Sequence, residues 1–527
     1  MKLKKTKTLF IAICLLIANS VFCFSQQKTD NITIVEDCTN HQFNPQLTDL
    51  SSDVQILCAA YEGLFSYNPV TLDPVYAIAV NYRISRDKKR WTFDINPNAR
   101  FSNGEHITAN HVRNTWLKLL SSKDAPYASL LDVIEGAAEY RTGEGFAEDV
   151  GIYAISDSQL MVHLCKPASY LPKILCHPAF SVMSDDENVY SGAYVISEVY
   201  EETESENAKI ILKKNPYYWD AEAVLTEQIT FIQSDDEEEN AFMYNTGFAD
   251  WVYASISTQK LIEKTDFLIN AEYGTSFMFF KLKQNEEEKD SIWNQLEFRQ
   301  ALFEAFPWEK FRAYYYVPAT TYVFPLQGYP EVEGFDFTDL IEAKKIMEDA
   351  RKTHGIPQEV KIPLNMEISK GSFNIDQLLL LKRACDSLNI ELQVKEIPVH
   401  QYLSGVPSSD ADLFYYTWIG DFADPYAFLE LFRSDSTLNA ANYSNAEFDE
   451  LLEKAAMASA EESLKIYAQA ENLLLDSCIV LPVSHPITAN IINTDLIGGW
   501  SLNALDLHPL KYLYRKNVKV VLGNNVI

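Results

Sequence analysis

Helix and strand patterns alternate between residues 338 and 418, and this alternation constrains the fold more than any other feature of the chain. The patterns predict, in order, helix 338–353, strand 360–366, helix 375–388, strand 390–396 and a buried strand at Leu413–Trp418. Such alternation is typical of an α/β unit whose strands pair in parallel. The chain has 527 residues, too many for one core, so the sequence predicts two or three lobes.

Further strands and helices flank this unit. We expect strands at 31–36, 80–85, 90–95, 208–213, 229–231, 277–282, 479–482 and 487–493, and helices at 51–61, 296–306, 445–458 and 461–476. Thr108 is the expected cap of one more helix, whose buried side includes Val112 and Trp116. The acidic run 235–239 fits the start of a helix, because carboxylates stabilise the positive end of the helix dipole.

An aspartate follows the strand that closes the α/β unit. Asp421 comes directly after Gly420, among the large aromatic residues Tyr415, Tyr416, Trp418 and Phe422. A carboxylate in such surroundings needs a positive partner, since an unpaired buried charge is costly. That partner is either a lysine or arginine of this chain or a cation brought by a ligand. Asp424, which precedes a proline, is expected to cap the next helix.

The N-terminus has the pattern of a secretory signal. Four lysines precede the apolar run Leu9–Ala18, which is too short for a confident membrane span. We expect cleavage after Ser25 and export to the periplasm or another extracytoplasmic space. Lipid attachment at Cys23 is the alternative, although Phe22 is a poor fit to the small residue expected there.

The charge balance argues against nucleic acid as a partner. The whole chain has 44 basic and 74 acidic residues, a formal charge of −30, and removal of the four signal lysines gives 40 − 74 = −34. A chain this acidic repels phosphate backbones and anionic lipid.

No pattern in the sequence indicates catalysis, a metal or a cofactor. The signal-free chain has six cysteines without a Cys-x-x-Cys motif; Cys165 and Cys176 could form a disulfide or remain thiols. The histidines lack paired metal spacing, and His106 and His111 are expected at the surface. Nucleophile-elbow, zinc-protease and phosphate-loop motifs are also missing, so we expect a protein that is not an enzyme.

Several segments, in a fixed order, resemble the extracytoplasmic solute-binding proteins of peptide ABC transporters, the oligopeptide/dipeptide-binding family 5. These segments are Tyr61–Leu64, Trp91–Phe93, Phe101–Gly104 with Thr108–Ala109, Ser191–Tyr194, Asn215–Trp219, Arg299–Leu302, Trp418–Pro425, and Asn442–Asn445 with Phe448–Asp449. Each one alone is a weak signal. Together they extend over nearly the whole signal-free chain.

The resemblance implies an α/β, periplasmic-binding-protein-like clamshell of two large α/β lobes plus a smaller inserted lobe. Mapped onto this sequence, residues 1–25 are the signal peptide, 26–61, 182–273 and 482–527 form lobe I, 62–181 form lobe II, the small insert, and 274–481 form lobe III. The function implied is capture of peptides between the lobes and delivery to the permease subunits of an ABC transporter in the membrane. We expect a monomer without a cofactor.

The resemblance also implies a role for Asp421. In peptide binders of this kind, an aspartate in the segment matching 418–421 pairs with the α-ammonium of the ligand, and the preceding backbone runs beside the peptide. The ligand-binding residues expected on this basis are Tyr415, Tyr416, Thr417, Trp418, Ile419, Gly420 and Asp421. Asp49 and Tyr127 are further candidates, near an acidic contact and an aromatic pocket segment of the oligopeptide binders.

One position departs from the family pattern. Oligopeptide binders place an arginine three residues before the tryptophan, where this chain has Tyr415. The carboxylate end of a peptide therefore lacks its usual partner, and Lys370 is a candidate substitute. Two alternatives stay open: the same fold holding a non-peptide solute such as a metal chelate, haem or a sugar, or a surface peptide sensor or adhesin.

Overall fold

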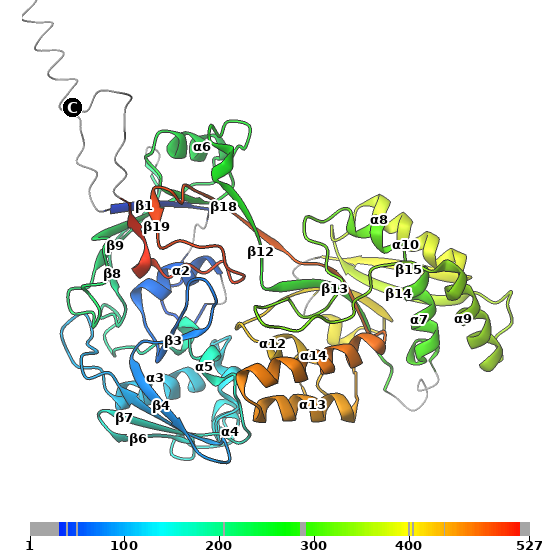
Figure 1. Cartoon of the computed structure of the whole chain (residues 1–527), viewed down its shortest axis with the longest axis horizontal. Helices are drawn as coiled ribbons and strands as arrows, with labels where there is room; N and C mark the ends of the chain where they lie inside the picture. The colour runs from blue at the N-terminus through cyan, green and yellow to red at the C-terminus, as the bar shows by residue number, and fades with distance from the viewer. Residues whose placement is uncertain are drawn as a thin grey trace, which may run out of the picture.

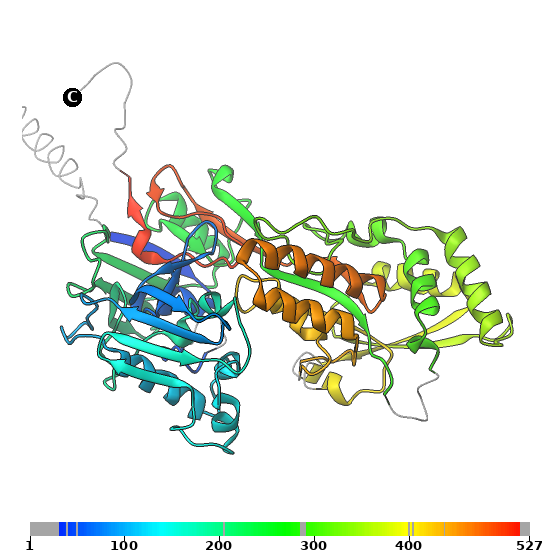
Figure 2. The same ribbon diagram turned by 60° about the horizontal axis from the view of Figure 1, so that its bottom comes forward.

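The computed structural model describes residues 31–37, 41–48, 51–203, 206–284, 291–398, 401–402, 405–436 and 438–516. Figure 1 shows two large bodies that lie side by side and are joined by long strands, and Figure 2 shows the same two bodies after rotation. Each body is built around its own β-sheet, and a smaller sheet lies beside the first.

The first body contains a seven-stranded sheet assembled from distant parts of the chain. Its strands, in spatial order, are β12 (Phe267–Ala271), β18 (Ile487–Ile492), β11 (Trp251–Tyr253), β1 (Asn31–Glu36), β10 (Gln228–Gln233), β9 (Lys209–Lys214) and β8 (Tyr194–Tyr200). Strand β1 lies parallel to both of its neighbours, and the other pairs are antiparallel. Its associated helices and short strands are α2 (Ser51–Ala60), α6 (Glu237–Asn245), β19 (Ile497–Gly498) and β20 (Tyr514–Arg515).

A four-stranded antiparallel sheet forms the smaller part. Its strands are β4 (Ala79–Ile84), β5 (Arg90–Ile95), β7 (Gln159–His163) and β6 (Ile152–Ser156), with the hairpin β2 (Phe65–Tyr67) and β3 (Pro74–Tyr76) and the helices α3 (Ala109–Ser121), α4 (Ala137–Thr142) and α5 (Leu171–Ile174). Thr108 is the N-cap of α3 as the sequence predicted, and its backbone N–H donates to Nδ1 of His111 at 3.0 Å. Trp91 and Trp116 are buried in this part.

The second body contains a five-stranded sheet with the predicted α/β unit. Its strands, in spatial order, are β15 (Ile390–Ile397), β14 (Ile362–Ser369), β16 (Leu413–Ile419), β13 (Gly274–Phe280) and β17 (Val480–Ser484). Its helices are α7 (Leu296–Ala305), α8 (Trp308–Arg312), α9 (Leu340–Thr353), α10 (Ile375–Ser387), α12 (Tyr426–Leu429), α13 (Ala446–Met457) and α14 (Ala460–Asp476). Strand β14 pairs in parallel with β15 and β16, so the predicted parallel pairing is confirmed.

Two short connections carry the chain between the large sheets. One leads from the end of β12 to the start of β13, and the other leads from β17 to β18. The two connections lie next to each other: the N–H of Glu272 in the first donates a hydrogen bond to the carbonyl of Pro486 in the second, at 2.9 Å. The strands of each sheet fall mainly within one of the lobes expected from the sequence. The exact borders of those lobes stay a prediction.

The thiols of Cys165 and Cys176 do not form a disulfide with each other. The five described cysteines are all free, and these two thiols donate to backbone carbonyls, Cys165 to Val133 at 3.2 Å and Cys176 to Pro172 at 3.3 Å. The signal segment, Cys23, Cys38 and Asp49 lie outside the described residues. Within the described part, no helix has the length and apolar character needed to cross a bilayer.

Candidate functional site

Strand β16 has an open backbone edge. All seven of its residues pair with β13, but on the other side only Leu413 and Phe414 pair with β14. Beyond Phe414 the two strands diverge, and Tyr402 fills the first part of the gap. Its hydroxyl donates to the Tyr415 carbonyl at 2.7 Å and accepts from the Tyr415 N–H at 3.1 Å.

The alternation of an antiparallel pair shows which backbone groups face this edge. Residues along such a strand point their N–H and C=O groups alternately toward and away from the paired neighbour. Tyr415 directs both groups away from β13, toward Tyr402. Thr417 and Ile419, two and four residues later, therefore present theirs at the same edge, and both residues are exposed.

Glycine is required where β16 ends. A Cβ atom at Gly420 would lie 2.4 Å from the ring of Tyr273 and 3.1 Å from that of Phe428. The Tyr273 ring is fully buried, so it could not move aside cheaply. The Gly420 N–H donates to the Tyr273 carbonyl at 2.8 Å, and the chain then turns and places Asp421 next to a cavity.

Asp421 and Asp424 lie in different electrostatic surroundings. The Asp424 carboxylate forms an ion pair with Lys173 at 2.8 Å and accepts the Tyr426 N–H at 3.0 Å. Its role is structural, but the expected helix cap is wrong, because Pro425 is the N-cap of α12 and no described side chain caps that helix. For the Asp421 carboxylate, no hydrogen bond or ion pair occurs within the described part of the chain. Burial raises the pKa of Asp421 to about 6, and no nearby cation opposes that rise.

The cavity beside Asp421 has a volume of about 410 Å³ and is built from both bodies of the molecule. We call it the Asp421 cavity; its lining residues are Val54, Gln55, Tyr67, Tyr127, His177, Tyr253, Glu272, Ile419, Gly420, Asp421, Leu505, Asp506 and Leu507. Three of these residues are carboxylic acids and none is a lysine or arginine. The cavity is therefore a one-signed, negative environment that suits a positively charged group.

Sequence reasoning missed two of the three acids and a histidine. Burial, and then the neighbouring Asp506, raise the pKa of Glu272, which lies in a connection between the two bodies. Asp506 accepts hydrogen bonds from Asn490 at 2.9 Å and from His508 at 3.1 Å. Burial lowers the pKa of His177 to about 3, so its ring is neutral at physiological pH. These residues come from distant segments, and no spacing in the sequence connects them with Asp421.

The predicted site residues separate into three groups. Ile419, Gly420, Asp421 and Tyr127 line the Asp421 cavity together, and the Tyr127 ring lies 4.2 Å from the His177 ring. Thr417 lies on the strand that leads to the cavity and hydrogen-bonds the Ser276 hydroxyl at 2.8 Å.

The other predicted side chains point elsewhere. Tyr416 and Trp418 line a small apolar pocket of about 60 Å³ on the opposite face of the sheet, where the indole N–H of Trp418 donates to the Ala427 carbonyl at 2.8 Å. Tyr415 is buried against Phe373, with ring centroids 4.5 Å apart. Lys370 follows β14 and is not among the residues that line the Asp421 cavity.

The histidines, cysteines and acids of the described segments do not gather into a metal-binding group. No three of these side chains lie close enough together to hold an ion. The acids of the run 235–239 instead begin α6, where Asp236 accepts the N–H groups of Glu238 and Glu239.

Comparison with known proteins gives a consistent result. The sequence model of the bacterial extracellular solute-binding proteins, family 5, matches residues 73–440. The dipeptide-binding protein DppE of Bacillus subtilis is 25% identical over 466 residues, which cover 84% of this chain and 83% of that protein. The periplasmic oligopeptide-binding protein OppA of Salmonella typhimurium is 24% identical over 487 residues, with 88% and 87% covered.

Solved structures share the fold. The unliganded open form of the periplasmic murein tripeptide binding protein MppA matches with a TM-score of 0.76 at 19% identity, covering 93% of this chain and 98% of that one. Haemophilus influenzae OppA in complex with the peptide RPPGFSPFR matches with a TM-score of 0.67 at 19% identity, covering 93% and 99%. The expected α/β clamshell fold is thereby confirmed. The relatives named here are binding proteins, not enzymes.

Proposed function

Because the chain belongs to the bacterial extracellular solute-binding proteins of family 5, we propose that it captures peptides at the Asp421 cavity, with Asp421 binding the α-ammonium group of the ligand. The observation that carries this proposal is the Asp421 carboxylate itself. It lines a cavity and has no partner among the described residues.

The charge of the cavity supports a cationic ligand group. Glu272 and Asp506 add two more carboxylates, and the cavity wall has no lysine or arginine to balance them. An ammonium group in this place gains from all three charges in surroundings of low dielectric. Every unblocked peptide has such a group at its N-terminus, whatever its sequence.

The open edge of β16 supports an extended peptide rather than a compact solute. The N–H and C=O groups of Thr417 and Ile419 at this edge have no partner among the described residues and can pair with a peptide backbone as with an added strand. Main-chain hydrogen bonds of this kind do not depend on the side chains of the ligand. Affinity would then come from the backbone pairing, and Asp421 would impose the requirement for a free N-terminus.

The setting of this activity follows the relatives. Dipeptides and oligopeptides are the ligands in the names of DppE and OppA, and OppA of Salmonella typhimurium is named as periplasmic. We infer that this chain is exported by its N-terminal signal, works as a monomer built from the three lobes defined above, and delivers peptides to the permease of an ABC transporter.

The test is a binding experiment with paired peptides. Isothermal titration should show that D421N weakens a tripeptide with a free N-terminus by about 2–4 kcal/mol, roughly 30- to 1,000-fold in Kd, because the ammonium loses its charged partner. The N-acetylated form of the same peptide should bind the unmodified protein as weakly as the free peptide binds D421N.

The matched control is D185N, which removes the same charge from an exposed position. Its Kd should stay within about twofold of the unmodified protein, since a distant surface charge is screened. Equal affinity of D421N and the unmodified protein for the free peptide would refute the ammonium role.

A further inference from the structure

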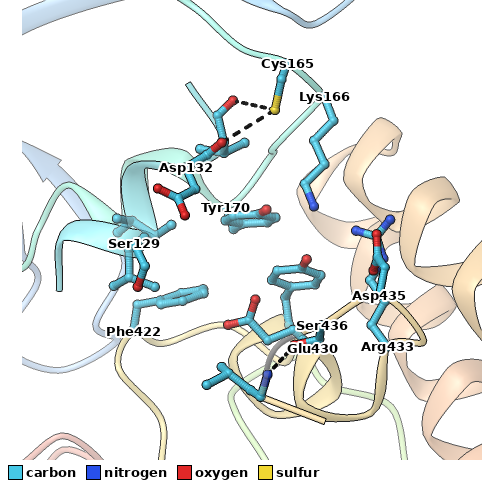
Figure 3. A pocket seen from close by; sticks show the side chains of 15 residues that line it. Ser129, Asp132, Cys165, Lys166, Tyr170, Phe422, Glu430, Arg433, Asp435 and Ser436 are labelled. Carbon is cyan, nitrogen blue, oxygen red and sulfur yellow. Dashed lines mark hydrogen bonds and ion pairs between the residues drawn. The ribbon is translucent and has the colours of Figure 1, made fainter. Parts of the chain in front are cut away.

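A second cavity lies between the segment that follows β16 and the smaller part of the molecule, which contains the four-stranded sheet and is called the small lobe below. It has a volume of about 390 Å³, and we call it the junction pocket (Figure 3). Its lining residues are Ser129, Leu130, Asp132, Val133, Cys165, Lys166, Tyr170 and Ile174 from the small lobe, and Phe422, Tyr426, Glu430, Arg433, Asp435, Ser436 and Leu438 from the second body. None of these residues lines the Asp421 cavity.

Aromatic stacking and an ion pair hold the two sides of the junction pocket together. The Tyr170 ring stacks on Tyr426 at 4.5 Å between centroids and 11° between planes, and on Phe422 at 5.8 Å and 24°. The neighbouring Lys173–Asp424 pair joins the same two segments at 2.8 Å. The pocket is therefore already formed in this arrangement of the lobes.

Some charged groups in the junction pocket already have partners. The Asp132 carboxylate accepts two hydrogen bonds from Arg141, at 2.9 Å and 2.5 Å. Asp435 pairs with Nε of Arg433 at 2.9 Å, and the other end of that guanidinium lies 3.5 Å from Glu453.

Two charged groups remain without a partner in the described ranges of the chain. Neither the Lys166 amine nor the Glu430 carboxylate forms a hydrogen bond or an ion pair there, with each other or with a third group. Burial, and then the nearby Arg433, lower the pKa of Lys166. Burial, and then Asp421, raise the pKa of Glu430 to about 7. Lys166 and Arg433 attract Glu430 through space, but neither Lys166 nor Glu430 gains a hydrogen bond or an ion pair in these ranges that would offset its desolvation.

The two charges have distinct places around the pocket. In Figure 3 the Lys166 amine reaches from the small lobe toward the Arg433 guanidinium, so two positive groups face each other. The Glu430 carboxylate points instead toward the rings of Tyr170 and Phe422. The pocket therefore offers a positive site for an anion and a separate negative site for a cation.

We propose that the junction pocket binds a small zwitterion of the amino-acid type, with its carboxylate between Lys166 and Arg433 and its ammonium at Glu430. A simple anion would leave Glu430 unpaired, and a simple cation would leave Lys166 and Arg433 facing each other. A zwitterion satisfies both sides at once. The aromatic rings of Tyr170, Phe422 and Tyr426 offer faces for an apolar side chain.

Such a ligand would join two lobes, since Lys166 belongs to the small lobe and Arg433 and Glu430 to the second body. Its binding would favour the arrangement in which these segments are stacked, by the differential affinity of the ligand for that arrangement. The junction pocket is then a second binding site, distinct from the proposed peptide site.

The test uses free L-phenylalanine, its N-acetyl derivative and its amide, titrated by calorimetry into the chain without its signal and carrying D421N. That background weakens the proposed ammonium site of the Asp421 cavity, and the junction-pocket substitutions described next assign the binding that remains. We expect L-phenylalanine to bind in D421N and each blocked derivative to bind at least tenfold more weakly, because each lacks one of the two charges.

Substitutions in the junction pocket should remove this binding. K166M and E430Q, each added to D421N, should weaken L-phenylalanine at least tenfold, whereas the exposed matched controls K123M and E447Q should not change it. K166Q, which keeps a polar side chain, serves as a second variant should K166M fail to fold, as judged by circular dichroism.

Three results would overturn the proposal. The first is no binding of L-phenylalanine in D421N, the second is binding that K166M and E430Q leave unchanged, and the third is equal binding of the blocked derivatives. The peptide site is tested separately, since K166M in the otherwise unmodified chain should leave tripeptide binding unchanged. The two proposals can therefore fail independently.

Discussion

Two neighbouring residues, Asp421 and Phe422, line two cavities whose charges differ: one wall is negative and the other has charges of both signs. The Asp421 cavity has three carboxylates and no lysine or arginine in its wall. The junction pocket, on the other side of Phe422, holds Lys166 and Arg433 as well as acids. Both cavities are formed between parts of the chain that are far apart in sequence.

The difference shows how one turn of the chain can contribute to two cavities that select different ligands. A cavity with charges of one sign attracts any cation and sets no condition on a second group. A cavity with separated charges of both signs requires both ends of the ligand. The cavities also differ in position. Glu272 places the Asp421 cavity at the connections between the two large sheets, whereas the junction pocket lies where Tyr170, the residue before α5, stacks on Tyr426 of α12.

The largest effect is expected from the ion pair that lies between these two regions. In K173M the Asp424 carboxylate, only 7% exposed, loses its cation and keeps the Tyr426 N–H as a hydrogen bond. We expect a loss of about 2–4 kcal/mol in the free energy of unfolding, because a buried charge is left unpaired. Denaturant titration measures this change.

The double variant K173M/D424N separates the charge from the packing. It should recover most of the lost stability, since no charge then remains unpaired. A double variant as unstable as K173M would contradict this explanation and would show that the aliphatic chain of Lys173, not its charge, stabilises the junction.

The next effect concerns the unbalanced charge of Asp421 itself. Its pKa in the folded chain is about 6, above its ordinary value of 3.8, so the folded protein binds this proton more readily than the unfolded chain does. The stability contributed by this group is therefore lost as pH rises from about 4 to about 6. At about pH 8, D421N should be more stable than the unmodified protein by about 1–3 kcal/mol.

Thermal unfolding at two pH values checks this sign. The advantage of D421N should amount to a few degrees at about pH 8 and should vanish only below about pH 3, where the carboxyl is largely protonated in both states. D185N is again the matched control and should show no such dependence. A D421N protein that is less stable at about pH 8 would mean that Asp421 has a stabilising partner in the chain.

The α/β unit could be predicted because its signal is local. Helices α9 and α10 and strands β14 and β15 each have their own periodicity, and their alternation implies the parallel pairing that the structure has. The position of Asp421 could be predicted for the same reason, since a strand, a glycine and an acid follow one another in the sequence.

The cavity walls could not be predicted because they are made by the topology. Glu272 and Asp506 meet Asp421 only after the chain has crossed between the sheets, and the sequence has no pattern that links them. The junction pocket was missed for the same reason, with Lys166 and Glu430 264 positions apart (430 − 166). Side-chain direction on β16 was a second limit, because a twofold alternation fixes two faces without telling which one meets the ligand.

The smallest effect is expected at Trp418. Its substitution tests which face of β16 contacts the ligand. The indole lines the apolar pocket on the face of β16 away from Thr417 and Ile419, and donates to the Ala427 carbonyl. W418F should therefore reduce stability by about 1–2 kcal/mol, from one lost hydrogen bond and some lost packing, and leave the peptide Kd within about twofold. W293F removes a comparable indole bond, to the Pro363 carbonyl in the same body, and should behave alike. A tenfold loss of peptide affinity in W418F alone would show that the indole, and not only the backbone edge of β16, meets the ligand.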